Sequence, residues 1–214
     1  MLKKIKLKLQ QLNDKIYTIN RLEDFDKFKG TFNTLSEDTI MFKIGFDLVQ
    51  FVEEMIKSIK NSRNKIKDET GFVLPLIRIT SSKTLQENEL LVYVQGREVF
   101  QEFLVFNKKE VNKEIDVIVR KIYDEYLDEI FTNEILEYYI NQVQKKNVWL
   151  IYDVMQILFV AEIKQLLMSL LKNGKSIKNI SLIFEKISTI INCNYRWQPR
   201  INIISLEKAL NNLV

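Results

Sequence analysis

The side chains best placed to do chemistry in this chain are four carboxylates on one predicted helix. They are Asp124, Glu125, Asp128 and Glu129. Residues four apart share a face of a helix, so the carboxylates form two neighbouring pairs. Such a pair can bind a divalent cation, but acidic residues interleaved with a lysine such as Lys121 are also typical of a solvated face. We expect the solvated face, with no metal site and no cofactor.

The composition excludes several classes of enzyme. None of the 214 residues is histidine, so a histidine-based triad, a histidine general base and a histidine-ligated metal site are all excluded. The single Cys193 cannot form an internal disulfide and has no cysteine partner at a metal-ligand spacing. The five glycines form no phosphate-binding loop. We therefore expect no catalytic residue and a protein that is not an enzyme.

Charge and aromatic residues argue against nucleic-acid binding. The 32 Lys and Arg residues are interleaved with 28 Asp and Glu residues, for a net charge of +4. Nucleic-acid-binding proteins more often concentrate their basic residues on one face. Trp149 lies at the entry of an apolar helix, where we expect a core side chain. Trp197, beside Arg196 and Pro199, can stack on a base or cap the helical region, and we favour the cap.

No stretch of the sequence is apolar enough to span a bilayer. In the most apolar region, residues 148–171, the longest uncharged run is Val154 to Ala161, against the roughly 18–20 residues that a membrane helix needs. Residues 1–9 alternate apolar and basic side chains without the apolar core of a signal peptide. We expect a short strand there and a cytoplasmic protein. Recruitment to a membrane complex by a partner stays open.

Periodicity predicts that the first half of the chain mixes strands with one long helix. Ile40, Phe42, Ile44 and Phe46 alternate as in a half-buried strand. Apolar residues then recur at helical spacing over residues 48–66, and Gly71 is placed to end that helix. A second strand over residues 72–79 would complete a strand–helix–strand unit, which favours parallel pairing of its two strands.

A β-hairpin is predicted next, with arms 89–95 and 98–106 and a turn at Gly96 and Arg97. The second arm is so rich in valine and phenylalanine that we expect both of its faces to be covered and its phenylalanines to lie in the core.

From residue 107 onward the pattern is helical. Ile115, Val119, Ile122 and Tyr126 mark one helix. After the cap Thr132, a second helix is predicted over residues 133–146. Residues 150–173 are apolar nearly all round, so this helix should be buried or broken into two packed pieces. Ser176 and Ser205 are the expected caps of the last two helices. The fold class is therefore α+β: an N-terminal extension (1–38), an α/β subdomain with a mixed sheet (39–112) and an all-helical subdomain (113–214).

A proline inside an apolar strand makes residues 71–80 recognisable. The run reads Gly-Phe-Val-Leu-Pro-Leu-Ile-Arg-Ile-Thr. Pro75 has no amide donor, so it fits only an edge, a bulge or a strand start. Together with the hairpin, this run resembles the signature of the FHIPEP family, the FlhA-like export-gate proteins of flagellar and virulence type III secretion. The matching residues are Gly71, Phe72, Val73, Pro75, Ile77, Arg78, Ile79, Asn88, Glu89, Gly96, Glu98 and Val99.

Further motifs follow in the order of the same family. Residues 170–180 read Leu-Leu-Lys-Asn-Gly-Lys-Ser-Ile-Lys-Asn-Ile and resemble a family helix corner, in which Gly174 ends one helix and Ser176 caps the next. Residues 132–136 resemble a helix start of the family, and residues 42–48 resemble its opening strand. The resemblance covers about residues 40–191.

The chain departs from the family pattern in two places. The family's soluble portion follows a multi-span membrane domain, which this chain lacks, and the opening residues favour a free-standing relative over a trimmed fragment. The family also carries an insert between hairpin and long helix, which builds most of its chaperone groove, and a final subdomain. Both are missing here, so chaperone docking cannot be transferred residue by residue. The parts that remain are those that stack neighbouring subunits in the family's ring of nine.

The resemblance implies a role in binding other proteins. We expect a non-enzymatic component of a type III-like export apparatus, which docks export partners or assembles with itself into a homo-oligomer. The hairpin tip, Gln95, Gly96 and Arg97, is the expected contact. The motif residues expected to shape the scaffold are Gly71, Pro75, Arg78, Gly96, Gly174 and Ser176. The alternative is a cytoplasmic α+β interaction or oligomerisation module unrelated to export.

Overall fold

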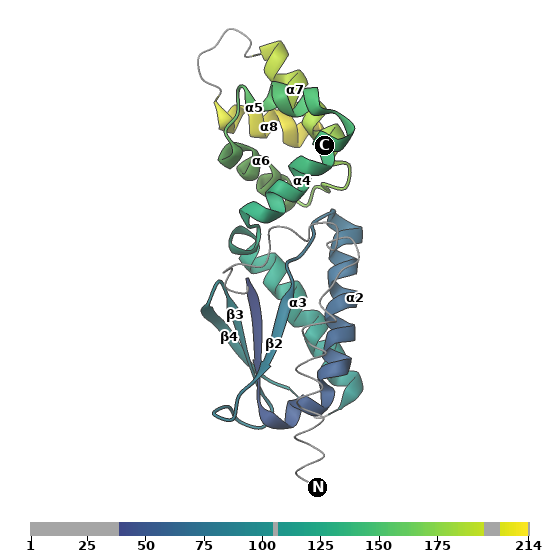
Figure 1. Cartoon of the computed structure of the whole chain (residues 1–214), viewed down its shortest axis with the longest axis vertical. Coiled ribbons are helices and arrows are strands. Elements are labelled where there is room, and N and C mark those ends of the chain that lie inside the picture. The colour runs from purple at the N-terminus through teal and green to yellow at the C-terminus, as the bar shows by residue number, and fades with distance from the viewer. Residues whose placement is uncertain (1–38, 105–106, 195–201, 214) are drawn as a thin grey trace. The chain divides into compact units, whose positions relative to one another are not determined.

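The computed structural model describes residues 39–104, 107–194 and 202–213. One mixed β-sheet is followed by helices, which confirms the α+β class (Figure 1). The described residues divide into two compact units. We call them the sheet unit (39–57 and 75–115) and the helical unit (58–74 and 116–213, without the gap). The predicted subdomain boundaries stay predictions. The expected N-terminal strand and the tryptophan at position 197 lie outside the described residues.

The sheet has four strands in the order β2-β1-β3-β4. The strands are β1 (Ile40–Ile44), β2 (Ile77–Ser81), β3 (Glu89–Val94) and β4 (Arg97–Phe103). β1 runs parallel to β2, with Ile40 opposite Ile77, and antiparallel to β3. The parallel pairing predicted from the strand–helix–strand pattern is therefore confirmed. It follows from the long helix between β1 and β2, because a parallel pair needs a crossover connection.

Strand β1 ends earlier than its alternation suggests. Ile40, Phe42 and Ile44 are buried, as predicted, but Phe46 lies outside the strand and is 45% exposed. The reason is Gly45, whose backbone N–H donates to the Glu89 carbonyl at 2.8 Å. A Cβ atom on Gly45 would lie 1.9 Å from a backbone oxygen. The chain turns there into the short 3-10 helix η2 (Phe46–Phe51).

The hairpin turns one residue earlier than predicted. Its central residues are Gln95 and Gly96, with φ of 51° and 74°, and Arg97 already opens β4. Two positive φ values in succession are the pattern of a type I′ turn, whose twist matches that of the flanking strands. The expectation that β4 is covered on both faces is wrong. β4 lies at an edge of the described sheet, and Phe103 is 50% exposed.

Two long helices contribute residues to both units. Helix α2 (Val52–Thr70) ends before Gly71, which has a φ of 80°, as predicted. Helix α3 (Lys108–Ile130) contains all four residues that marked a helix in the sequence, and one of them, Tyr126, has non-helical backbone angles. The strand expected from residue 72 begins only at Ile77, because residues 72–76 form an extended connection without strand pairing.

The remaining helices belong to the helical unit. They are α4 (Asn133–Lys146), α5 (Val148–Met155), α6 (Val160–Lys172), α7 (Ile180–Asn194) and α8 (Ile203–Leu213). The bounds predicted for α4 are confirmed. Residues 150–173 were predicted to form either one buried helix or two packed pieces, and the structure has two pieces. The axes of α5 and α6 differ in direction by 104°.

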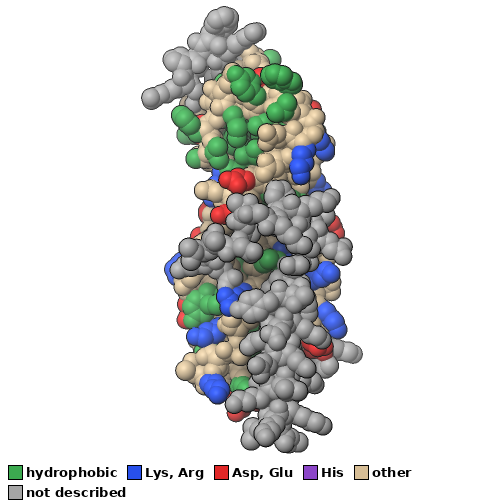
Figure 2. All heavy atoms as spheres, viewed as in Figure 1, with side chains coloured by type: hydrophobic (Ala, Val, Ile, Leu, Met, Phe, Trp, Pro, Cys, Tyr) green, Lys and Arg blue, Asp and Glu red, His purple; other side chains and the backbone are tan. Residues whose placement is uncertain are grey.

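Trp149 was expected in the core, and this prediction is wrong. Its side chain is 72% exposed, and hydrophobic side chains gather on the surface of the helical unit (Figure 2). Helix α5 begins at the cap Asn147, whose side chain accepts from the backbone N–H of Leu150. The register set by this cap buries Leu150, Ile151 and Val154 and turns Trp149 outward.

The corner between α6 and α7 is a Schellman motif. Gly174 has a φ of 70°, its N–H donates to the Leu171 carbonyl, and the next N–H donates to the Leu170 carbonyl. Gly174 therefore ends α6 as predicted. Ser176 does not cap α7: its hydroxyl accepts from Lys178 within the connecting turn.

Asparagines take the cap positions that were predicted for serines. The Asn179 side chain accepts from the third amide of α7. The Asn202 side chain accepts from the Ile204 and Ser205 amides of α8, so Ser205 lies inside that helix. Both helices start where an asparagine reaches back to free amides, and the serines beside them had the same capping preference in the sequence.

The turn residue Gln95 provides a test of this hairpin geometry. Gln95→Asn should raise the urea midpoint, by up to about 1 kcal/mol in unfolding free energy, because asparagine tolerates positive φ better than glutamine does. Gln95→Val should lower the midpoint, because a β-branched side chain is strained there. Tryptophan fluorescence or circular dichroism can follow both. Shifts of the same sign for both variants would contradict a left-handed conformation at Gln95.

Candidate functional site

Two segments about a hundred residues apart meet beside Gly71, in the helical unit. The backbone N–H of Ile177 donates to the Thr70 carbonyl at 2.7 Å. A Cβ atom on Gly71 would lie 2.4 Å from the backbone nitrogen of Lys178, and the φ of Gly71 is +80°. Only glycine satisfies both the close backbone approach and the left-handed conformation. We call this crossing of residues 70–74 over residues 177–178 the Gly71 junction.

Tyr139, on α4, fixes the backbone on both sides of Phe72. Its hydroxyl donates to the Gly71 carbonyl at 2.8 Å and accepts from the Val73 N–H at 2.9 Å. Burial raises the pKa of the Tyr139 phenol well above its usual range, so the phenol keeps the proton that it donates. One buried side chain thus satisfies two backbone groups that have no strand partner.

The next residues of this segment are held by a guanidinium and by aromatic packing. Nε and Nη2 of Arg63 donate to the Leu74 carbonyl at 3.2 and 2.7 Å. Burial lowers the pKa of Arg63 to about 10, so the side chain is charged at neutral pH. The fully buried Phe72 ring lies 5.7 Å from that of Tyr123 and 5.4 Å from that of Phe131. These contacts explain why β2 begins only after residue 76.

An open pocket of about 500 Å³ adjoins the Gly71 junction. Its lining mixes apolar side chains with two lysines, one carboxylate and two tyrosines. The lining residues are Lys67, Asp68, Gly71, Val73, Tyr138, Tyr139, Gln142, Ile177 and Lys178. The Tyr139 hydroxyl is already engaged with the backbone, so it is not available as an acid or base for a bound molecule.

Two of the four carboxylates singled out on α3 are paired with cations. Nε of Arg120 lies 3.4 Å from Asp124, one turn away on α3, and Nζ of Lys172 lies 2.6 Å from Asp128. Among the described residues, no group of three or more Asp, Glu or Cys side chains could hold a metal ion. These pairs fit a solvated helix face.

A further carboxylate, Asp116, joins α2 to α3 within the helical unit. It accepts hydrogen bonds from the buried Ser62 hydroxyl and from Nζ of Lys65, the latter at 3.0 Å. The Ser62 hydrogen bond, followed by Lys65, lowers the pKa of the Asp116 carboxyl. Arg120 adds a second link by donating to Glu69. These contacts stabilise the helix pair from which the Gly71 junction emerges.

The predicted hairpin tip lies in the sheet unit. Gln95, Gly96 and Arg97 are exposed and consecutive at the turn, and the Gln95 N–H donates to the Thr39 carbonyl at 2.9 Å. All three residues are therefore exposed on one turn, which is joined by this hydrogen bond to the start of β1.

The other motif residues lie in different parts of the fold. Pro75 lies in the connection before β2, where no ladder amide is needed. Arg78 lies on β2 opposite Met41 of β1 and is half-buried. Gly71 meets the segment that follows Gly174 and Ser176, at Ile177 and Lys178.

The FHIPEP family profile matches residues 4–118, more than half of the chain. The chain belongs to the FHIPEP family. The resemblance stated from residues 71–99 is thereby confirmed. Among curated protein sequences, none gives a significant match.

Solved structures share the fold of this FHIPEP chain. The MxiA protein of Shigella flexneri aligns with a TM-score of 0.61 and 16% identity over 82% of this chain and 64% of MxiA. The Chlamydia pneumoniae CdsV and CdsO protein complex aligns with a TM-score of 0.65 and 12% identity, over 83% of this chain and 67% of the matched chain. The nonameric EscV cytosolic domain from the type III secretion system aligns with a TM-score of 0.63 and 13% identity, over 83% of this chain and 64% of the matched chain. The chain thus spans under two thirds of the length of MxiA and EscV.

No single helix of the described residues is long and apolar enough to cross a membrane. The pair α5 and α6, bent by 104°, passes that test together, by length and composition only.

Sequence reasoning missed the two side chains that hold the Gly71 junction. Arg63 is one of several basic residues on α2, and Tyr139 is one of two adjacent tyrosines on α4. Nothing in their spacing shows that they meet backbone groups of residues 71–74. The only signal available was the proline-interrupted segment itself, whose backbone groups needed partners from elsewhere.

Alanine substitutions at two glycines can distinguish the energetic cost of a steric overlap at Gly71 from the cost of a left-handed backbone conformation. Gly71→Ala should cost about 3 kcal/mol in unfolding free energy, because strain adds to displacement of the Lys178 backbone. Gly174→Ala is the matched control: it has a similar positive φ but no atom within 4 Å of its Cβ position. It should cost only about 1 kcal/mol. Equal costs in chemical denaturation would mean that the junction contributes nothing beyond conformation.

The Asp116 carboxylate should make the free energy of unfolding depend on pH in the acidic range. Its folded-state pKa is lowered, so its contribution is present above the unfolded pKa of about 3.9 and is lost as pH falls through the folded value. Asp116→Asn should cost about 1 kcal/mol at pH 7, a value reduced for solvent screening because the side chain is 42% exposed.

Urea unfolding at pH 7 and at pH 2.5 measures this effect. The difference between wild type and Asp116→Asn should shrink in acid. The control is Asp68→Asn, an exposed carboxylate on the same helical unit, which should change stability little at either pH. A difference that stays constant from pH 7 to pH 2.5 would remove the proposed role of the Asp116 charge.

Proposed function

We propose that this FHIPEP chain is a non-enzymatic, cytoplasmic component of a type III or flagellar protein-export apparatus. It acts by binding other proteins, as a docking subunit and as a member of an assembly of its own copies. The observation that carries the proposal is the family match over residues 4–118. The shared fold with the EscV cytosolic domain supports it.

The relatives support protein partners of two kinds. EscV is nonameric, and CdsV forms a complex with CdsO. This chain keeps the sheet with its hairpin and the helices after it, and it aligns over more than four fifths of its length with these structures. A scaffold retained in this way can present surfaces to copies of itself and to export proteins.

The hairpin tip is the partner contact that we propose in the sheet unit. A type I′ turn has a fixed conformation, so Gln95, Gly96 and Arg97 lose little conformational freedom on binding. β4 follows the tip at an edge of the described sheet, and an edge strand can pair with an extended segment of another protein. The tip and the edge together form one continuous surface for recognition.

The polar side chains of the helical unit support a role without catalysis. Tyr139 and Arg63 satisfy backbone groups, and Asp124 and Asp128 pair with cations. These contacts give each of the four side chains a structural partner within the helical unit. Binding surface is what the exposed residues supply.

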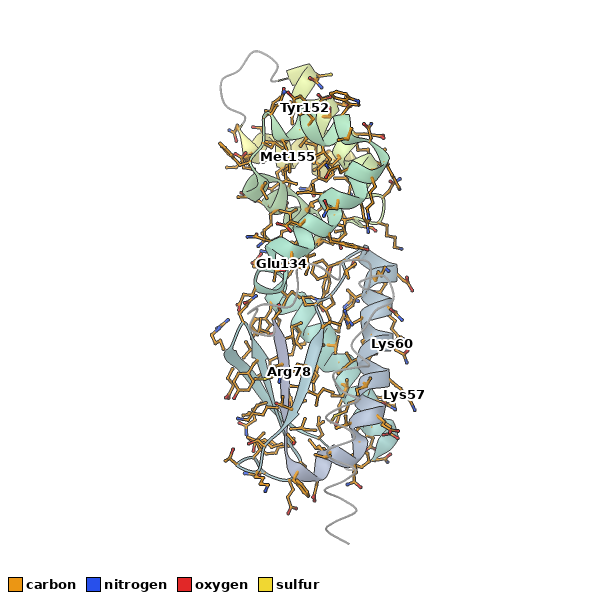
Figure 3. The ribbon with its side chains drawn as sticks, in the orientation of Figure 1. Lys57, Lys60, Arg78, Glu134, Tyr152 and Met155 are labelled. Atoms are coloured by element: carbon orange, nitrogen blue, oxygen red, sulfur yellow. The ribbon has the colours of Figure 1, made fainter. Side chains whose placement is uncertain are left out.

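Affinity capture from native lysate with the full chain as bait tests the proposal. Export-apparatus proteins should be enriched, and Arg97→Glu should lower their recovery several-fold without lowering the melting temperature, because the tip is exposed. The control is Lys57→Glu, an exposed charge reversal on α2 in the same sheet unit (Figure 3).

Two results would contradict the proposal. Enrichment of proteins with no link to export would favour an interaction module unrelated to secretion. Equal losses for Arg97→Glu and Lys57→Glu would mean that overall charge, and not the hairpin tip, controls capture.

A further inference from the structure

Helix α5 and the corner that follows it expose a group of large hydrophobic side chains in the helical unit. We call this group the α5 surface; Tyr152 and Met155, which are labelled in Figure 3, belong to it. Exposed fractions run from 38% to 78%, with Phe159 the highest and Trp149 next. Figure 2 shows hydrophobic side chains gathered on the helical unit. The members are Val148, Trp149, Tyr152, Met155, Ile157, Phe159 and Val160.

The α5 surface is large and has few hydrogen-bonding groups. From the exposed fractions, the seven side chains present on the order of 700 Å² of apolar surface, taking about 150–250 Å² for each aromatic residue. The largest apolar patch on a typical monomer is about 300–600 Å². Between Asn147 and Ala161 the only charged or amide side chains are Asp153 and Gln156. A protein interface forms about one hydrogen bond per 100–200 Å² and has a polar rim, so it uses more polar groups than this surface offers.

The backbone of the corner makes its hydrogen bonds inside the helical unit. The N–H groups of Ile157 and Leu158 donate to the Val154 carbonyl at 3.2 and 2.9 Å. The Phe159 N–H donates to Oε2 of Glu162 at 2.7 Å, which turns that carboxylate back onto the chain. Leu158 is only 2% exposed and anchors the corner in the core. A turn whose amides are already bonded in this way can enter an apolar medium without leaving those donors unsatisfied.

Charged side chains lie at the borders of the α5 surface. Lys145 and Lys146, the last two residues of α4, are exposed and precede α5. Lysines beside an apolar face attract the anionic headgroups of a bilayer. Successive residues of a helix are about 100° apart, so Asp153 and Met155 lie at opposite borders of the exposed face of α5. A bilayer that meets the Met155 border leaves the Asp153 carboxylate at the level of the headgroups, where it keeps its water.

The kinds of side chain on the α5 surface also suit a bilayer surface. Tryptophan and tyrosine are enriched where a membrane meets water, because their rings are apolar with one polar edge. Trp149 and Tyr152 stand one turn apart, with ring centroids 6.3 Å apart. Along α6 the apolar character of the surface ends after the first turn, since Ile163 and Leu166 are buried and Lys164 is half-buried. The contact with a bilayer is therefore shallow.

We propose that the α5 surface binds the surface of a membrane that contains anionic lipids. Trp149, Met155 and Phe159 enter the boundary between headgroups and acyl chains. Lys145 and Lys146 lie against the headgroups. The helical unit rests on the bilayer through this surface, and α5 and α6 do not cross it. This membrane contact goes beyond the proposed binding of export proteins and does not depend on it.

Flotation of the full chain with lipid vesicles tests the membrane contact. Vesicles of phosphatidylcholine mixed with phosphatidylglycerol should bind the chain about 10-fold more tightly than vesicles of phosphatidylcholine alone, because the lysines contribute only with anionic headgroups. Trp149→Ser with Phe159→Ser should weaken binding to the mixed vesicles at least about 10-fold, because both side chains leave the apolar face. Val117→Ser is the control, since Val117 is 66% exposed on α3 and outside the α5 surface. Circular dichroism and melting curves verify that all variants fold.

A chain with one tryptophan reports where Trp149 lies. The sequence has two tryptophans, so Trp197→Phe leaves Trp149 as the single fluorophore. Its emission should shift to shorter wavelength on the mixed vesicles, because the indole leaves water. Lipids that carry bromine on their acyl chains should quench it, because the ring then lies within contact distance of those chains.

Charge reversal tests the role assigned to the lysines. Lys145→Glu with Lys146→Glu should abolish the preference for phosphatidylglycerol. The matched control is Lys178→Glu with Lys208→Glu, which changes the net charge by the same amount at two exposed lysines elsewhere on the helical unit. Equal losses for the two pairs would mean that net charge alone directs the chain to anionic vesicles, and this would remove the proposed orientation of the α5 surface.

The remaining outcomes separate this inference from the proposed function. A wild type that does not bind the mixed vesicles, a Trp149 and Phe159 variant that binds them as the wild type does, or emission of Trp149 that brominated lipids leave unchanged would overturn the membrane contact. Loss of self-association in that variant, with no vesicle binding by the wild type, would make the α5 surface a protein interface. Capture of export proteins by the hairpin tip would still stand in each case. Vesicle binding without such capture would leave the membrane contact intact and remove the export role.

Discussion

The helical unit depends on the close approach of two backbones at Gly71. A glycine with positive φ lets residues 70–74 pass against residues 177–178, where a Cβ atom would overlap the Lys178 backbone. The segment has no strand partner, so its polar groups must be satisfied by side chains. Tyr139 and Arg63 supply the hydrogen bonds, and Phe72 fills the core between Tyr123 and Phe131. Helices α2, α3, α4 and the turn before α7 are held together by this one crossing.

The same unit engages several of its polar side chains in structural contacts. The buried phenol and guanidinium bind backbone atoms, and the acidic residues of α3 pair with Arg120 and Lys172. On the surface, the hairpin turn of the sheet unit is exposed, and α5 in the helical unit exposes Trp149 and Tyr152. The chain belongs to the FHIPEP family, and the solved structures that share its fold include a nonameric EscV domain and a complex of CdsV with CdsO.

The sequence was reliable where one local pattern dominated. The apolar period of α2, the glycine after it and the bounds of α4 were predicted because spacing and end signals agreed. It failed where the partner of a residue decided the outcome. The phenylalanines of β4 were predicted to lie in the core, but Phe100 is half-buried and Phe103 is exposed. Trp149 was also predicted to lie in the core, but the Asn147 cap sets a register that turns it outward. The hairpin tip could be located from sequence to within one residue, whereas Tyr139 and Arg63 could not be found.

The sequence by itself determined the elements, their order and the family, because periodicity, glycine positions and a proline-interrupted motif are local properties of the chain. Only the tertiary structure decided which faces of the helices and strands are buried and which backbone groups are hydrogen-bonded by side chains. Those outcomes depend on segments far apart in sequence, such as Thr70 and Ile177, whose contact no spacing encodes. Burial and hydrogen-bond satisfaction are properties of the assembled fold, so a tryptophan or a tyrosine acquires its role only when its neighbours are in place.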